Sequence, residues 1–209
     1  MMNNVKKIIN LLWFFPFFLG NPKGVLLTHK NLVSVIATGT NEGFHHNDVY
    51  LSYLPLPHIM ERLFVHNIMF YGGRIGFYFG NVAELKKDLA ALKPTIFVSV
   101  PRLYTRFYDV IKTNLEKATG VKGKIAKRAL ASKMRKVLST GKVTSKMWDS
   151  LVFKKSKEAL GGKVRWAGTG SAPISGETLS FLKATLCTPI AEGNRKIKYF
   201  CYWIWFLNK

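Results

Sequence analysis

Short apolar runs alternate with segments of helical periodicity from residue 24 onward. Runs rich in β-branched and aromatic residues predict strands, and apolar residues spaced three or four apart predict helices. The predicted strands span residues 25–27, 49–54, 74–79, 95–100 and 163–167. Helices are expected after Thr28, over 58–70 and 82–92, through most of 102–160, and after Ser175. Strands and helices in alternation favour parallel pairing with helical crossovers, so the chain is predicted to be an α/β protein.

The two ends of the chain break this alternation. Residues 1–20 contain an apolar run that is interrupted by one asparagine and one proline. Because the run is shorter than the roughly 20 residues that span a bilayer, it favours a weak anchor, a signal peptide or a segment foreign to the domain. Residues 194–209 mix basic and aromatic residues, and both ends are rich in residues with AT-rich codons, as translated intron sequence would be. We therefore separate an apolar segment (1–20), a folded part (21–193) and a tail (194–209).

The positive charge of the chain is unevenly placed. There are 32 Lys and Arg against 11 Asp and Glu, which gives a formal net charge of +21. Between residues 122 and 163 only Asp149 and Glu158 oppose a series of cations. Such a stretch attracts nucleic acid, acidic lipid headgroups or polyphosphates, or it is simply a solvated helical face. It is nearly free of aromatic residues apart from Trp148 and Phe153, which disfavours nucleic acid, because single-strand binders interleave aromatic with basic residues.

Patterns that mark metal or hydrolytic sites are not found in the sequence. The 2 cysteines have neither CxxC spacing nor neighbouring histidines, so neither a disulfide framework nor a zinc site is predicted. His45 and His46 have no third ligand nearby, and no Ser-His-Asp or HExxH pattern occurs. We therefore assign no metal ligand.

Four segments, in order along the chain, carry a stronger signal. Residues 21–31 (NPKGVLLTHKN) place a Pro-Lys-Gly loop before a strand and a helix. Glycine permits close approach of the backbone and lysine supplies charge, so such a loop suits an anion. The other three segments are 53–62 (YLPLPHIMER), 100–104 (VPRLY) and 165–175 (RWAGTGSAPIS).

Together these segments resemble the adenylate-forming superfamily, and in particular the long-chain acyl-CoA synthetases. The resemblance covers residues 21–193, where IAEG at 190–193 marks the start of the family's next motif. It implies part of the large N-terminal domain of an adenylate-forming enzyme, in which strands alternate with helices in incomplete sheets. An incomplete sheet leaves apolar strand edges exposed, so we expect such an edge here.

The resemblance also implies a set of site residues. Contacts to the nucleotide and its phosphates are implied for Lys23, Gly24, Gly170, Ser171, Ala172 and Pro173. His58 would lie beside the acyl and nucleotide pocket, although a histidine that starts a helix is also explained by a hydrogen bond to the backbone. Glu192 and Gly193 are the remnant of a further motif. Glu61 and Arg62 are expected to form a structural ion pair.

The activity that the resemblance implies has two halves. A fatty-acid carboxylate attacks the α-phosphate of ATP and releases pyrophosphate, and the thiol of coenzyme A then displaces AMP. Because the substrates supply the nucleophiles, the protein positions them and stabilises charge together with Mg²⁺. A long-chain fatty acid, ATP and coenzyme A are the expected partners. The resemblance also implies membrane association, at the endoplasmic reticulum or the cytoplasmic face of another membrane.

Two parts of the family pattern are not found in this sequence. Residues 14–20 stand where a Ser/Thr/Gly-rich phosphate loop is expected, and residues 194–197 stand where the family has Tyr-Gly-x-Thr-Glu. The expectation is therefore a fragment of a long-chain fatty acid–CoA ligase that lacks a complete catalytic set and is slow or inactive as written. The alternative is a non-catalytic basic protein that binds membrane surfaces or nucleic acid.

Overall fold

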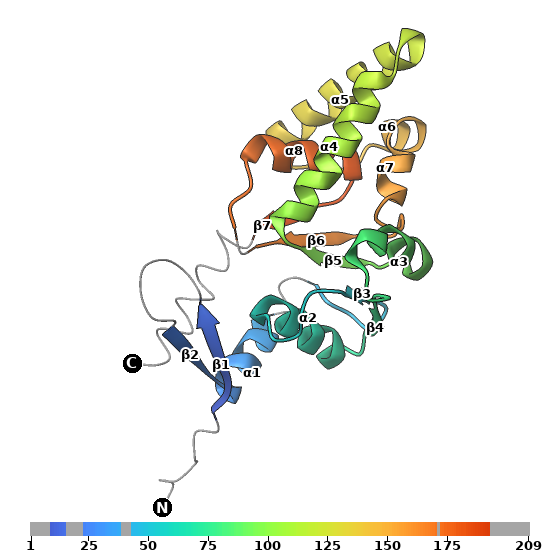
Figure 1. Ribbon diagram of the computed structural model, residues 1–209. Coiled ribbons are helices and arrows are strands. Elements are labelled where there is room, and N and C mark those ends of the chain that lie inside the picture. Colours follow the sequence, from blue (N-terminus) through green and yellow to red (C-terminus); the bar gives the residue numbers. More distant parts are fainter. Residues whose placement is uncertain (1–8, 16–22, 39–42, 171, 193–209) are drawn as a thin grey trace, which may run out of the picture.

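The computed structural model describes residues 9–15, 23–38, 43–170 and 172–192, and within them a five-stranded sheet forms the centre (Figure 1). The strands lie in the order β4-β3-β5-β6-β7, and every neighbouring pair is parallel. Their bounds are β3 Val49–Ser52, β4 Arg74–Phe77, β5 Ile96–Ser99, β6 Trp166–Thr169 and β7 Ile190–Glu192. The predicted α/β class and parallel pairing are confirmed.

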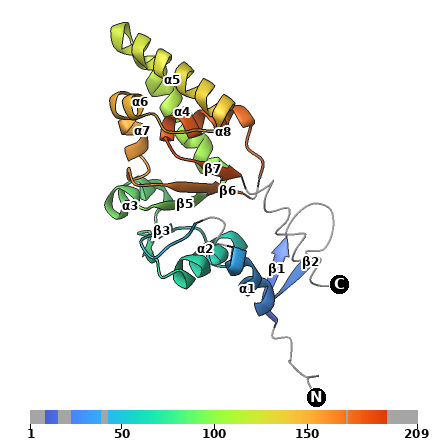
Figure 2. The same ribbon diagram turned by 180° about the vertical axis from the view of Figure 1, so that it is seen from behind.

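Helices connect successive strands and cover both faces of the sheet (Figures 1 and 2). β3 leads through α2 (Ile59–Phe70) to β4, and β4 leads through η2 (Val82–Glu84) and α3 (Leu85–Leu92) to β5. The stretch between β5 and β6 comprises α4 (Pro101–Lys117), α5 (Gly120–Thr140), α6 (Lys146–Leu151) and α7 (Lys154–Glu158). The last connection, from β6 to β7, is α8 (Gly176–Leu186).

The central strands are buried on both faces because their side chains alternate between two apolar clusters. In β5, Ile96 and Val98 pack with Tyr50 against α2. Phe97 points the other way and packs with Leu51 among residues of α3, α4 and α8. Each large apolar side chain buried in this way stabilises the fold by about 1.5–3 kcal/mol relative to exposure. Burial on both faces explains why β5 is a continuous apolar run in the sequence.

The last predicted strand is displaced. It was expected at 163–167 but spans Trp166–Thr169, so Gly168 belongs to the strand and not to the following turn. The ladder with β5 runs from Ile96 opposite Trp166 to Ser99 opposite Thr169. Backbone pairing with a strand that is distant in sequence sets this boundary, and local apolar periodicity does not record it.

An antiparallel pair of strands precedes the sheet. β1 (Ile9–Phe15) pairs with β2 (Lys23–Thr28), which continues into α1 (His29–Thr38). β1 was not predicted, because a short apolar run gives no periodicity that separates a strand from an anchor. Thr28 Oγ1 accepts a hydrogen bond from the Asn31 N–H at 3.3 Å, which confirms the predicted helix cap. Within the described residues, no helix combines the length and the apolar character that crossing a membrane requires.

Among the described residues, one edge of the sheet is open and apolar, as expected. β4 pairs only with β3 among the described strands. Phe77 at its end is 80% exposed, and Phe79 just beyond it is 87% exposed. An exposed apolar edge strand offers unpaired backbone groups to other chains, so this edge favours self-association.

A lysine is buried in the helical layer. Lys133 of α5 is 1% exposed, and its Nζ contacts the carboxylate of Asp149 and lies 3.0 Å from Cys187 Sγ. The same ammonium lies 5.2 Å from the centre of the Phe153 ring. Burial raises the pKa of the Cys187 thiol to about 11, although Lys133 acts in the opposite direction. The thiol is therefore protonated near neutral pH, and the cluster joins α5, α6 and α8.

An ion pair with a buried carboxylate joins the amino ends of three strands. Asp48, directly before β3, is fully buried, and its Oδ1 accepts hydrogen bonds from Arg165 Nε at 2.8 Å and from Thr95 Oγ1 at 2.7 Å. Arg165, directly before β6, also donates to the Gly43 carbonyl at 2.7 Å. Burial by itself raises the pKa of Asp48, but hydrogen bonds from Arg165, Thr95 and the His45 N–H outweigh it, so the pKa lies below its usual value.

Replacing Arg165 with Met is expected to destabilise the chain by about 3 kcal/mol near neutral pH, because the buried Asp48 carboxylate loses its counter-ion. Folding lowers the pKa of Asp48, so its stabilisation is present above the unfolded value of about 3.9 and is lost as pH falls through the folded value. The difference between wild type and Arg165→Met should therefore shrink at acidic pH. Urea unfolding at neutral and acidic pH measures it.

The matched control is Lys87→Met, which breaks an exposed pair. Lys87 Nζ lies 2.8 Å from Glu84 Oε1, and the two side chains are 76% and 44% exposed. Exposed pairs of this kind contribute at most about 0.5–1 kcal/mol, so the free energy of unfolding of the control should be close to that of wild type. Equal losses in the two variants would contradict the role given to Arg165.

Candidate functional site

The loops after the parallel strands meet at one edge of the sheet. The chain passes from β3 to β4 on one side and then places β5 on the other side of β3, so the strand order reverses there. Open α/β sheets bind ligands outside the carboxyl ends of the strands at such a reversal. The edge between β3 and β5 is therefore the expected position of a binding site.

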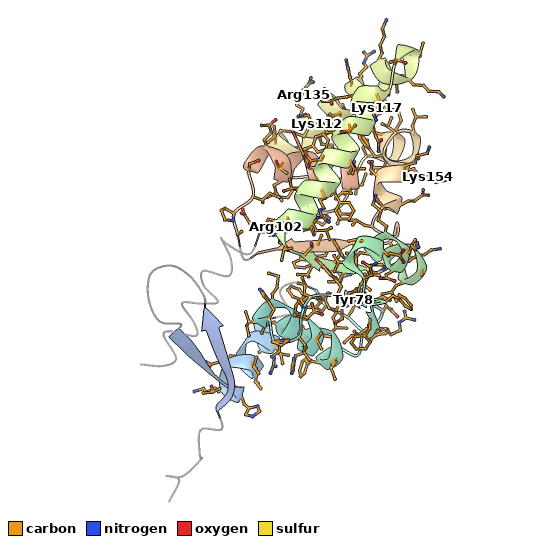
Figure 3. The ribbon with its side chains drawn as sticks, in the orientation of Figure 1. Tyr78, Arg102, Lys112, Lys117, Arg135 and Lys154 are labelled. Carbon is orange, nitrogen blue, oxygen red and sulfur yellow. The ribbon has the colours of Figure 1, made fainter. Side chains whose placement is uncertain are left out.

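A cleft of about 480 Å³ opens at this position. It is lined by Tyr53, Val82, Val100, Arg102, Leu103, Thr105 and Arg106. Its volume is in the range of small-molecule pockets, about 300–1,000 Å³. Figure 3 shows Arg102 at the sheet end of α4, and Arg106 follows one turn later. No salt bridge among the described residues involves either arginine, so the cleft combines apolar walls with two cations available to an anion.

One wall of the cleft is fixed by a hydrogen bond between neighbouring strands. The Tyr53 hydroxyl donates to Ser99 Oγ at 2.6 Å. Its ring stacks on Phe97 and meets Tyr78 edge-on, with ring centres 6.0 and 6.5 Å apart. Burial raises the pKa of Tyr53 to about 12, although the Ser99 hydrogen bond acts against it. The phenol is therefore a neutral donor near physiological pH.

His58 caps the start of α2. Its Nδ1 accepts a hydrogen bond from the Met60 N–H at 3.2 Å, and its carbonyl accepts one from the Arg62 N–H at 3.1 Å. The side chain is half-buried, and burial lowers its pKa. The interpretation of His58 as a backbone-bonded residue at a helix start is confirmed. His58 is not part of the cleft lining, and its place beside an acyl pocket stays a prediction.

The predicted nucleotide turn follows β6 at the same edge. Gly170 is buried, whereas Ala172 and Pro173 are exposed and precede α8, whose N-cap is Ser175. Ser171 lies outside the described residues. The expected helix start is confirmed, because Ser175 Oγ accepts a hydrogen bond from the Thr178 N–H at 3.1 Å.

Glu192 ties this turn to the neighbouring strand. Its Oε1 accepts a hydrogen bond from the Ile174 N–H at 3.3 Å. Thr169 lies opposite Glu192 in the ladder, is 3% exposed, and its Oγ1 has no hydrogen-bond partner among the described residues. Because an unpaired buried hydroxyl is costly, this atom points to a ligand group or a water molecule at the edge. Gly193 lies outside the described residues.

Lys23 and Gly24 lie in strand β2, and the predicted loop at these two positions is wrong. They pair with Phe15 and Phe14 of β1, and this unpredicted partner extends the strand. In both views the β1–β2 hairpin is separated from the ends of β5 and β6 (Figures 1 and 2). The structure therefore does not bring Lys23 to the turn at Gly170.

The expected ion pair between Glu61 and Arg62 is also wrong. Glu61 is fully buried and accepts a hydrogen bond from the Tyr50 hydroxyl at 2.6 Å. No salt bridge in the described part of the chain joins Glu61 to Arg62. Adjacent residues of a helix do not face each other, which explains the difference. Burial raises the pKa of Glu61, while hydrogen bonds from Ser52 and Tyr50 act against it.

Sequence interpretation gave no role to several residues of the cleft. Arg102 belongs to the motif at 100–104, and Thr105 and Arg106 lie just beyond it. A signal was available, because Arg102 follows the predicted strand 95–100 and a spacing of four places Arg106 on the same face of the helix. Thr169, the last residue of β6, had no such signal, since its burial depends on the displaced strand boundary.

Metal-binding clusters are not found in the part of the chain that the structure describes. No three His, Cys, Asp or Glu side chains there are grouped so that they could hold a metal ion. His45, one of the histidine pair, instead uses its backbone N–H to donate to Asp48 Oδ2 at 3.0 Å.

Comparison with known sequences gives matches along most of the chain. Residues 20–193 match the family described as AMP-binding enzyme. The chain is 46% identical over 177 residues to peroxisomal long chain acyl-CoA synthetase 7 of Arabidopsis thaliana, covering 83% of this chain and 25% of that protein. It is 42% identical over 172 residues to long-chain-fatty-acid–CoA ligase 5 of Rattus norvegicus, covering 80% and 25%. The chain thus spans about a quarter of the length of these relatives.

Solved structures with a similar fold include two adenylation domains. The adenylation domain of the carboxylate reductase of Mycobacterium chelonae has a TM-score of 0.66 at 19% identity, covering 89% of this chain and 26% of that chain. The A-PCP didomain of carboxylic acid reductase from Segniliparus rugosus, in complex with AMP, has a TM-score of 0.63 at 21% identity, covering 89% and 23%. At this level of identity the likeness concerns the fold.

Replacing His58 with Asn is expected to make the stability of the chain less sensitive to pH between neutral and mildly acidic conditions. Folding lowers the pKa of His58, so the unfolded state binds a proton first, and stability falls as pH drops below about 6.5. Asparagine caps a helix but does not titrate, so the variant keeps the cap and loses this contribution. Urea unfolding across this pH range measures the slope, and an unchanged slope would contradict the assignment.

Proposed function

We propose, because the chain belongs to the AMP-binding enzyme family, that it forms part of a long-chain fatty acid–CoA ligase. The observation that carries this proposal is the 46% identity over 177 residues to a long chain acyl-CoA synthetase. The reaction converts a long-chain fatty acid, ATP and coenzyme A to acyl-CoA, AMP and diphosphate. Residues 21–193 act as a partial AMP-binding domain, and residues 1–20 and 194–209 lie outside it.

The proposed reaction uses nucleophiles that the substrates bring. A carboxylate oxygen of the fatty acid forms a bond to the α-phosphorus as the bond to pyrophosphate breaks. The sulfur of coenzyme A then bonds to the acyl carbon, and AMP leaves with both electrons of the broken bond. The protein therefore contributes positioning and charge stabilisation, which work best where water is excluded.

We assign the adenine of ATP to the turn formed by Gly170, Ser171, Ala172 and Pro173. The hydrogen bond from Ile174 to Glu192 supports this assignment, because it fastens the turn to β7. We assign the phosphates to Lys23 and Gly24, and the neighbourhood of the acyl group to His58. Lys23 reaches the phosphates only if β2 approaches the carboxyl edge of the sheet more closely than in the structure described above.

The cleft beside β3 and β5 supports the same proposal. All three substrates are anions, and Arg102 and Arg106 add two cations to its rim. Its walls include Val82, Val100 and Leu103, which suit a hydrocarbon chain better than a nucleotide. The neutral Tyr53 hydroxyl beneath is a hydrogen-bond donor only to Ser99 among the described residues.

Mg²⁺ would accompany ATP in this reaction. The described residues do not offer three grouped metal-ligating side chains, so no step is assigned to a metal bound by them. ATP and coenzyme A enter the proposal as substrates.

We further propose that the protein works at a membrane surface, at the endoplasmic reticulum or the cytoplasmic face of another membrane. The net charge of +21 favours an acidic lipid surface. Two Arabidopsis relatives are named peroxisomal.

An exchange experiment tests the ligase proposal. Residues 21–193 replace the aligned segment of Arabidopsis long chain acyl-CoA synthetase 7, which supplies the remainder of the enzyme. The chimera is expected to form palmitoyl-CoA from palmitate, ATP and coenzyme A, measured by chromatography, while the 209-residue chain alone forms little or none. A chimera that unfolds cooperatively but makes no acyl-CoA would rule out the proposal.

Within this chimera, Glu192→Ala is expected to raise the KM for ATP about fivefold, because one hydrogen bond that positions the turn is lost. Glu192→Gln should change the KM less, since its amide oxygen still accepts from Ile174. The KM for palmitate should stay the same in both variants. A drop in kcat with an unchanged KM for ATP would contradict the positioning role.

A further inference from the structure

Helices α4 and α5 form a hairpin that projects away from the sheet (Figures 1 and 2). The buried residues of α4 are Tyr104, Phe107 and Ile111, all in the part nearer the sheet. α5 returns along α4 and packs on α8. The turn requires Gly123, because a Cβ there would lie 2.1 Å from the Ala118 carbonyl oxygen. Residues 117–128, which we term the hairpin tip, are mostly exposed, and only Gly123 and Ala126 among them are buried.

The hairpin tip carries several cations, and its acidic neighbour in sequence is Glu116, directly before Lys117. No Asp or Glu occurs between Glu116 and Asp149, and Asp149 is engaged by the buried Lys133. The exposed cations of the tip are Lys117, Lys122, Lys124, Lys127 and Arg128. No salt bridge among the described residues involves any of them. Figure 3 shows Lys117 at the end of α4 farthest from the sheet.

Two apolar side chains are exposed among these cations. Val121 is 73% exposed and Ile125 is 38% exposed. With Lys124 and Arg128 they follow the spacing of one helix face, opposite the buried Ala126. A purely solvated helix face would carry polar residues at these positions. The tip instead combines exposed cations with exposed apolar side chains, as helices that bind membrane surfaces do.

We propose that the hairpin tip docks on an anionic lipid bilayer. Val121 and Ile125 enter the headgroup region, and the surrounding lysines and Arg128 contact acidic headgroups. Each cation near such a surface raises the affinity about fivefold, so several together give binding that two small apolar side chains could not. The tip has no aromatic residue on which a base could stack, which favours lipid over single-stranded nucleic acid.

The proposed ligase function would explain why the tip docks on a membrane, and this explanation rests on that proposed function. A long-chain fatty acid resides in the bilayer, so an enzyme that activates it gains from contact with the membrane. The docking itself depends only on the charge and exposure of the tip, and it is tested without fatty acid, ATP or coenzyme A. Failure of the docking would therefore leave the ligase experiment unaffected, and the reverse is also true.

Vesicle flotation of the 209-residue chain tests the proposal. The probe is phosphatidylcholine vesicles with and without phosphatidylserine. The triple variant Lys122→Glu, Lys124→Glu, Arg128→Glu should bind the acidic vesicles at least about tenfold more weakly than wild type. The matched control reverses three exposed cations away from the tip: Arg74→Glu, Lys86→Glu and Lys163→Glu. This control has the same net charge as the tip variant. Its affinity for acidic vesicles should fall less than about threefold, because screening limits the effect of distant charges.

The apolar part of the tip has its own variant. Val121→Ser with Ile125→Ser should weaken binding to acidic vesicles about threefold or more and leave the salt dependence unchanged, because it removes no charge. Circular dichroism checks that each variant is folded. Residues 1–20 are the same in all of them, so a difference between variants cannot come from that segment.

Several outcomes would overturn the proposal. Equal losses in the two triple variants would mean that only the net charge matters. If wild type bound neutral vesicles as tightly as acidic vesicles, acidic headgroups would not be recognised. Binding of single-stranded DNA that the tip variant abolishes, without binding to acidic vesicles, would identify the tip as a nucleic-acid surface.

Discussion

The ion pair between the buried Asp48 carboxylate and Arg165 sets the alignment of the central strands. A carboxylate without access to water needs its partners in fixed geometry, so β3, β5 and β6 start at matched positions. Strands advance by roughly 3.3 Å per residue, and this alignment carries over to the other end of the sheet. Tyr53, Ser99 and Thr169 consequently lie side by side at the carboxyl edge. The arrangement of the carboxyl edge thus depends on an interaction at the opposite end of the same strands.

The carboxyl edge of the sheet has two candidate binding regions, the turn that begins at Gly170 and the cleft that Arg102 lines. The resemblance to a family pointed to His58 and to the turn after Gly170. Geometry added the cleft with Arg102, which lies where the strand order reverses. Charge at this edge, from Arg102 and Arg106, and charge at the hairpin tip are separate features, although composition alone reports them as one excess.

Much of the fold could be predicted from the sequence because its signals are local. Apolar periodicity identified the strand of Phe97 and the helix that His58 caps. The pairing of β1 with β2, the end of β6 and the contact of Asp48 with Arg165 could not be predicted, because they join segments whose partners local patterns do not specify. The same limit applies to the site. Glu192 was found from a motif, whereas Thr169 depends on backbone pairing, and the placement of Lys23 depends on a strand that the apolar run did not reveal.

The burial of Lys133 has a consequence for chemical labelling of the chain. An amine-reactive reagent meets the exposed lysines directly, but it reaches Lys133 only when α5 moves away from α6 and α8, because the amine is 1% exposed and engaged by Asp149. Its rate of modification therefore reports local opening of the helical layer, separately from unfolding of the sheet. The modification rate of this single lysine thus measures how often the helical layer opens locally.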